Sequence, residues 1–259
     1  MQTLLSTRIF SGRPLDDQAL RLVREHGLVR LELDVRDEHV DFRSVPEVRM
    51  LRRRLASHGL SAPWLRLGED FLRRLGRDVG LSELTAAVVA AGPEAVVLPL
   101  SRRWEDSGVP PLTDVVFRIR QAGARPILHA RRVDAPGIEA FPWLGVCWDL
   151  AFGPGEEEEM RRQVQEAIEG LERRRLAGVR IASLRDGRRD VPAEPQAALL
   201  ERAWPGLAPT TLVYDVDAPG GSLLDIAQAF DEIRAFHLGE KRPPGQRKGG
   251  LFWAAMAPG

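Results

Sequence analysis

The stretch Leu-Thr-Asp-Val-Val-Phe-Arg-Ile-Arg-Gln-Ala-Gly-Ala-Arg-Pro-Ile-Leu-His, residues 112–129, contains the pattern that decides the fold. Residues 112–122 separate apolar and polar side chains onto two faces, as an amphipathic helix does. Gly123 follows at the position where a left-handed residue commonly ends a helix. Residues 124–129 are a short apolar run that predicts a strand. The segment is therefore a helix, a glycine stop and a strand in immediate succession.

The same unit recurs along the chain. Amphipathic helices are predicted over 16–26, 46–58, 81–91 and 156–177, and each is followed by a glycine: Gly27, Gly59, Gly92 and Gly178. A strand is predicted after each glycine, over 28–35, 60–67, 95–100 and 179–184. Strands that alternate with helices in this way pair in parallel through crossover connections.

Three further apolar runs, 3–10, 145–151 and 211–217, bring the number of predicted strands to eight. The strands start about 30 residues apart, which predicts an α/β fold, a (β/α)8 TIM barrel in one domain. A helix over 223–236 would close it. Pro136 and Pro142 leave little room for a helix over 131–144, so the fifth helix is predicted to be short or absent. A doubly wound open sheet is the alternative, but no Gly-x-Gly-x-x-Gly follows the first strand.

Composition narrows the class of protein. The 259 residues include 37 Lys and Arg against 37 Asp and Glu, and this zero formal net charge argues against a generally basic nucleic-acid binder. The N-terminus has no basic segment leading into an apolar stretch, and no run is long enough to span a membrane, so we expect a cytoplasmic protein.

Cys147, the single cysteine, is interpreted as a small buried hydrophobe. We expect residues 1–240 to form the barrel and 241–259 a C-terminal tail.

The strand ends carry the candidate site, because TIM barrels place their chemistry at the carboxyl ends of the strands. Asp149 and Asp215 lie in otherwise apolar strands, where a carboxylate needs a partner, a metal or a catalytic role. His129 closes a third strand. One imidazole and two carboxylates suit Mn²⁺, Zn²⁺ or Fe²⁺. The alternative is that these acids form ion pairs with nearby arginines.

Arginines form a second group at the strand ends. A guanidinium suits phosphate and carboxylate groups, so these side chains predict a site for a small anionic ligand or substrate. The candidate substrate-binding residues are Arg66, Arg102, Arg131 and Arg185.

The order of these segments resembles the xylose isomerase-like TIM barrel superfamily, which includes sugar-phosphate isomerases and epimerases. The likeness covers roughly residues 15–236. Leu-Val-Arg-Leu-Glu-Leu resembles the family's second strand, Cys-Trp-Asp-Leu the sixth, and Val-Tyr-Asp-Val the eighth. The resemblance implies that Asp149 is a metal ligand. The family's other ligand positions differ here: His129 stands near an expected Glu, Ser183 in place of a His, and Asp215 near the last Glu.

Three functions follow as hypotheses. The first is a divalent-metal isomerase, epimerase or lyase for a small polyol or sugar phosphate, with the metal on His129, Asp149 and Asp215 and with Glu32 or Asp186 as the catalytic base. The second is a non-catalytic barrel that binds an anionic ligand or a protein partner through its arginine-rich rim. The third is a CitE-like carbon–carbon lyase, which Trp-Leu-Arg-Leu and Ala-Val-Val-Leu-Pro resemble, although the fifth strand ends in His instead of Glu.

Overall fold

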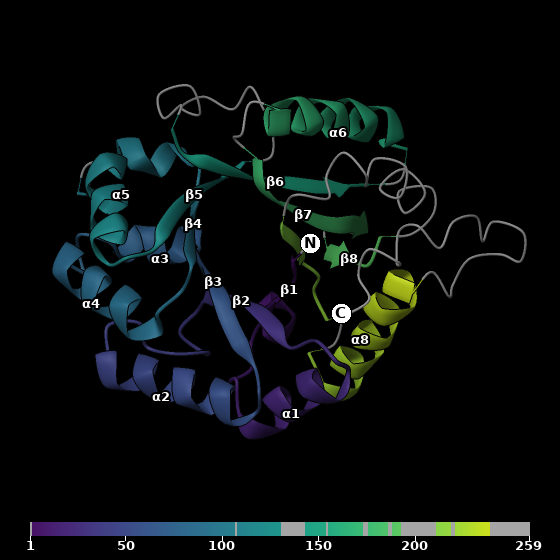
Figure 1. The fold of residues 1–259 in the computed structure, drawn as a ribbon, viewed down its shortest axis with the longest axis horizontal. Helices are drawn as coiled ribbons and strands as arrows, with labels where there is room; N and C mark the ends of the chain where they lie inside the picture. Colours follow the sequence, from purple (N-terminus) through teal and green to yellow (C-terminus); the bar gives the residue numbers. More distant parts are fainter. Residues whose placement is uncertain are drawn as a thin grey trace, which may run out of the picture.

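The computed structural model is a closed barrel of eight parallel strands (Figure 1). It describes residues 2–106, 108–130, 143–153, 155–172, 176–185, 188–192, 211–218 and 221–238. The barrel strands are β1 (Gln2–Ser6), β2 (Arg30–Val35), β3 (Ser61–Leu67), β4 (Ala95–Pro99), β5 (Arg125–Ala130), β6 (Gly145–Phe152), β7 (Leu176–Arg185) and β9 (Thr211–Tyr214). Each pairs with its neighbours in sequence, and β9 closes the ring by pairing with both β7 and β1. The predicted (β/α)8 barrel is therefore confirmed.

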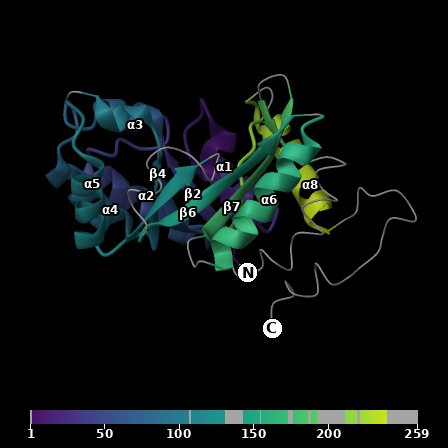
Figure 2. The ribbon, with the colours of Figure 1, turned by 90° about the horizontal axis from the view of Figure 1, so that it is seen from above.

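Helices cover the outside of the barrel, as Figure 1 shows. Figure 2 places α4 and α5 at the opposite end of the molecule from α8. The glycine stops are confirmed at Gly27, Gly59, Gly92 and Gly123, which all have positive φ. No described helix is long and apolar enough to cross a membrane. The helices are α1 (Asp17–Glu25), α2 (Val45–Ser57), α3 (Glu69–Arg74), α4 (Leu81–Ala91), α5 (Leu112–Gln121), α6 (Glu157–Glu172) and α8 (Leu223–Leu238).

Gly178 is the exception to the glycine rule. The helix predicted over 156–177 has its described end at Glu172, and Gly178 lies inside β7 instead of ending a helix. The reason is packing: a Cβ atom at Gly178 would come within 2.5 Å of the Trp64 ring and 2.8 Å of the Thr211 carbonyl oxygen. Glycine in a strand often marks a site where another group approaches the backbone closely, as the Trp64 ring does here.

Some predicted boundaries also change. The first strand ends at Ser6, and residues predicted to extend it form the 3-10 helix η1 (Thr7–Phe10). The last strand ends at Tyr214 instead of 217. The sequence patterns missed α3, the 3-10 helix η2 (Arg102–Glu105), and β8 (Arg188–Asp190), a short strand antiparallel to the end of β7. Residues 131–142 of the fifth connection and the predicted tail 241–259 lie outside the described residues.

The barrel interior is divided along its axis. An apolar cluster fills one part of it, made of Leu4, Trp64, Ala95, Val97, Ile127, Cys147 and Val213. The interpretation of Cys147 as a buried hydrophobe is confirmed, since the residue is fully buried and burial raises the pKa of its thiol. Two residues further along the same strands, the inward positions become polar: Cys147 is followed by Asp149, and Val213 by Asp215. The apolar cluster therefore lies beneath a charged layer at the carboxyl ends of the strands.

Candidate functional site

The charged layer is a network of buried ion pairs. Its members come from strands that are far apart in sequence but adjacent in the barrel, and all of them project inward. They are Glu32 on β2, Arg66 on β3, His129 on β5, Asp149 on β6, Arg180 on β7, Arg189 on β8, and Asp215 directly after β9. Three carboxylates face three guanidinium groups, so the network is electrically balanced when His129 is neutral.

Arg180 lies at the centre of this network. Its side chain is fully buried, and its Nη2 atom donates a hydrogen bond to Glu32 Oε2. Its Nη1 atom lies 3.0 Å from Asp215 Oδ2. Both carboxylates are also fully buried. Burying an isolated charge destabilises the folded state. The ion pair with Arg180 offsets this desolvation cost for the Glu32 carboxylate.

Arg189 reaches the barrel from outside the eight parallel strands. The short strand β8 folds back on β7, and the Arg189 side chain enters between two barrel carboxylates. Its Nη1 and Nη2 atoms both donate to the Asp149 carboxylate, Nη1 at 3.0 Å, and its Nε atom lies 3.0 Å from Asp215 Oδ2. This guanidinium thus forms a bidentate ion pair with Asp149 and also contacts Asp215.

The arginines keep both aspartates ionised. Burial alone would raise the pKa of Asp149, but Arg189 and His129 outweigh it, and the pKa lies below its ordinary value. Burial likewise opposes ionisation of Asp215, but Arg180, Arg189 and Arg66 hold its pKa well below the usual range. The same carboxylates raise the pKa of Arg189, against the effect of burial. Both aspartates are therefore anions whose charge is already compensated.

The described structure brings two of the three predicted metal ligands together. His129 Nε2 lies 3.5 Å from Asp149 Oδ2, so those two residues do come together. Asp215 instead faces Arg180 and Arg189. Among the described residues, no three His, Cys, Asp or Glu side chains are grouped so that they could hold a metal ion. Guanidinium groups are paired with both carboxylates that the ion would need, so in this arrangement neither is free to bind a divalent metal.

The two candidate bases have different outcomes. Glu32 is present at the charged layer, but it is fully buried and paired with Arg180, with no exposed surface toward the mouth of the barrel. It therefore contributes to the ion-pair network in this arrangement. Asp186 lies outside the described residues.

Among the described arginines of the charged layer, Arg66 is the one that makes no hydrogen bond. Its side chain is 15% exposed, and its Nη1 atom is 3.7 Å from Asp215 Oδ1, beyond hydrogen-bond distance. Burial opposes its charge, but Asp215, Asp34 and Asp149 together raise the pKa of Arg66. Arg102 is exposed on η2. Arg185 ends β7, with its side chain outside the description, and Arg131 lies outside the described residues.

Two further pairs stand at the rim, and the sequence patterns did not identify them. Arg8 Nε lies 2.7 Å from Asp217 Oδ1, which ties η1 to the segment after β9. Arg36 Nε lies 2.8 Å from Asp34 Oδ2, just beyond β2. Both arginines are 29% exposed and hydrogen-bonded to their carboxylate partners, whereas Arg66 lies 3.7 Å from its partner Asp215.

Comparison with known proteins places this geometry in a fold class. No family model matches the chain, and no curated protein matches it in sequence. Solved structures do match over nearly the whole length. A xylose isomerase domain-containing protein from Salmonella typhimurium has a TM-score of 0.59 at 13% identity, covering 92% of this chain and 97% of that one. A D-psicose 3-epimerase has a TM-score of 0.61 at 9% identity, with coverages of 93% and 98%.

A 3-keto-D-glucoside 4-epimerase from E. coli gives a TM-score of 0.57 at 13% identity, covering 91% of this chain and 99% of that one. At such identities the likeness concerns the fold. The chain has the fold of the xylose isomerase-like TIM barrels, as its segment order predicted.

Proposed function

We propose that this protein is a ligand-binding barrel that takes a small anionic molecule, such as a sugar phosphate or a polyol carboxylate, at its carboxyl-end mouth. Arg66 would bind the anionic group, and no divalent metal would take part. The observation that carries the proposal is the pairing of Asp149 and Asp215 with Arg180 and Arg189, while Arg66 makes no hydrogen bond within the described part of the chain.

The chemistry of the mouth supports this reading. A guanidinium offers a planar fork of donors that matches phosphate and carboxylate oxygens. Arg66 stands in a partly buried position, where such hydrogen bonds are stronger than in bulk water. The imidazole of His129, whose side chain is 12% exposed, lies in the same layer and offers a further polar contact for ligand hydroxyls. The fold shared with sugar epimerases favours a polyol framework for the ligand.

Thermal unfolding with added ligand tests the proposal. At a ligand concentration of ten times Kd, binding to the native state contributes about 1.4 kcal/mol, which raises Tm by about 3–6 °C for a chain of this size. Inorganic phosphate and a hexose phosphate are the probes. Arg66→Ala should remove the shift, whereas Arg49→Ala, an exposed arginine on α2, should keep it. An unchanged Tm with both probes would refute the proposal.

A metal-dependent sugar isomerase or epimerase is the second candidate, favoured by the fold and by the contact between His129 and Asp149. Elemental analysis of the purified protein distinguishes the ligand-binding barrel from the metal-dependent enzyme. The first proposal expects less than stoichiometric Mn, Zn and Fe, and an unchanged Tm after chelation. A stoichiometric metal whose removal lowers Tm would favour the second.

A further inference from the structure

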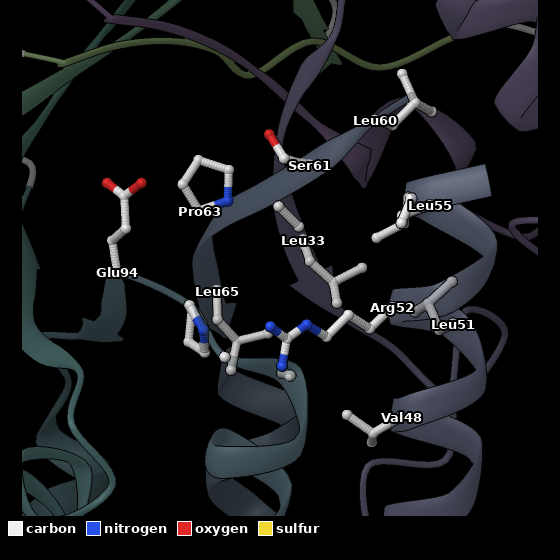
Figure 3. Close-up of a pocket in the computed structure, with 15 residues that line it drawn as sticks. Leu33, Val48, Leu51, Arg52, Leu55, Leu60, Ser61, Pro63, Leu65 and Glu94 are labelled. Carbon is white, nitrogen blue, oxygen red and sulfur yellow. The ribbon is translucent and has the colours of Figure 1, made fainter. Parts of the chain in front are cut away.

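A cavity lies away from the charged layer, between the helices α2 and α4 and the outer face of the barrel (Figure 3). Its volume is about 260 Å³. The walls are mainly aliphatic, because α2 and the strands β2 and β3 turn their apolar faces toward each other at this point. The larger aliphatic side chains of the wall are Leu33, Val48, Leu51, Leu55, Leu60 and Leu65.

Arg52 supplies a positive charge to this apolar space. Figure 3 shows its side chain extending from α2 across the cavity toward Leu65 on β3. The guanidinium lies over Gly92, where an added Cβ would come within 2.7 Å of Nη1. Its one hydrogen bond within the described residues is long, 3.5 Å from Nη1 to the Ala90 carbonyl oxygen. Arg52 is exposed, and no described carboxylate lies within ion-pair distance of it, so its remaining donors face solvent at the edge of the cavity.

The other charged residue at the cavity does not compensate Arg52. Glu94 lies at the opposite side in Figure 3, and its Oε1 atom is 3.4 Å from Arg30 Nη2. The cavity therefore combines a long aliphatic wall with a single cationic group that has free donors. Its complement is a molecule with an aliphatic tail and one anionic head, because a wholly polar ligand would leave its polar groups buried against leucines.

We propose that this cavity binds a medium-chain aliphatic carboxylate, with the tail among the leucines and the carboxylate on Arg52. A cavity of 150 Å³ holds benzene, so 260 Å³ holds a ligand of about ten non-hydrogen atoms. Octanoate has that size. A carboxylate accepts two parallel hydrogen bonds from one guanidinium, which fits the single charged group at this site.

Isothermal titration of the full chain with octanoate tests the proposal, and two substitutions on α2 provide a matched pair. Arg52→Gln removes the charge at the cavity and should weaken binding by about tenfold or more. Arg53→Gln removes a neighbouring exposed charge that does not line the cavity and should leave binding unchanged. Ala56→Leu adds bulk to the cavity wall at an exposed helix position and should also weaken binding.

The tail and the head are tested separately. Shorter carboxylates should bind about fourfold more weakly for each methylene removed, and butanoate is the shortest probe. Octan-1-ol, which has the tail without the charge, should bind more weakly than octanoate and should not respond to Arg52→Gln. The proposal is overturned if octanoate shows no saturable binding, if octan-1-ol binds equally well, or if Arg52→Gln and Ala56→Leu both leave the affinity unchanged.

Discussion

Arg180→Met tests how much stability is lost when a buried carboxylate in the barrel loses its cationic partner. The substitution removes the guanidinium and keeps an unbranched side chain of similar reach. It leaves Glu32 and Asp215 in place, and both carboxylates are fully buried. Asp215 retains Arg189 at 3.0 Å, whereas the described ion pair of Glu32 is with Arg180 alone. The uncompensated charge in the variant is therefore mainly that of Glu32.

The magnitude follows from the geometry. At the 3.0 Å separation of Arg180 Nη1 and Asp215 Oδ2, Coulomb's law with an effective dielectric constant of about 20 gives about 5.5 kcal/mol. Desolvation of the buried ions opposes this attraction by several kcal/mol, so the complete network contributes little net stability. Removing one partner leaves the desolvation cost without the attraction. We expect Arg180→Met to lower the free energy of unfolding by about 3–5 kcal/mol.

A second substitution isolates the cause. Glu32→Gln removes the charge that Arg180→Met leaves uncompensated. If that charge is the source of the loss, the double variant should be more stable than Arg180→Met alone by about 1 kcal/mol or more. Adding Glu32→Gln to the wild type should not stabilise it, because there the carboxylate is paired.

Urea unfolding at pH 7, followed by tryptophan fluorescence, measures these differences. Two of the six tryptophans, Trp64 and Trp148, lie in barrel strands and are buried, so part of the signal comes from the barrel itself. If Arg180→Met yields too little folded protein, the double variant is compared with Glu32→Gln. A loss below about 1 kcal/mol, or a double variant less stable than Arg180→Met, would refute the reasoning.

Two further predictions concern the same interior. Because the pKa values of Asp149 and Asp215 are lowered in the folded state, their stabilisation is present above the unfolded carboxyl pKa of about 4 and is lost as the pH falls below it. Unfolding free energies measured from pH 6 to pH 3 should fall more steeply for the wild type than for Asp149→Asn, and equal slopes would contradict the assignment. Gly178→Ala should destabilise by about 1–3 kcal/mol through its clash with Trp64, and a loss within experimental error would show that the ring moves aside at no cost.

The barrel could be predicted because its signals are local and repeated. Helix amphipathicity, a glycine stop and an apolar strand each depend on a few neighbouring residues, and eight evenly spaced strands leave few alternative folds. Gly178 escaped this reasoning because its role depends on Trp64, which is distant in sequence. The strand β8 was not predicted, because its three charged residues show no alternation of apolar and polar side chains. Its pairing with the end of β7 is what defines it.

The sequence predicted several residues of the charged layer, among them Asp149, Asp215 and Arg66, but it did not predict which carboxylate pairs with which arginine. The rule that found Asp149, a charge in an apolar strand, would also have found Arg180, which stands between Val179 and Ile181. Which acid meets which arginine depends on strand order and register around the ring, and one sequence does not contain that geometry. Metal ligation and ion pairing thus remained alternatives until the partners of Asp149 and Asp215 were visible.

Arg189 provides positive charge at the mouth of the barrel, beside Asp149 and Asp215. A metal ion has a dissociation constant, and its occupancy depends on what the surroundings provide. A guanidinium carried on β8 is synthesised with the chain and lies beside Asp149 and Asp215 in every folded molecule. The positive charge that Arg189 brings to the mouth is therefore encoded in the sequence. A single mutation at position 189 would change that charge balance.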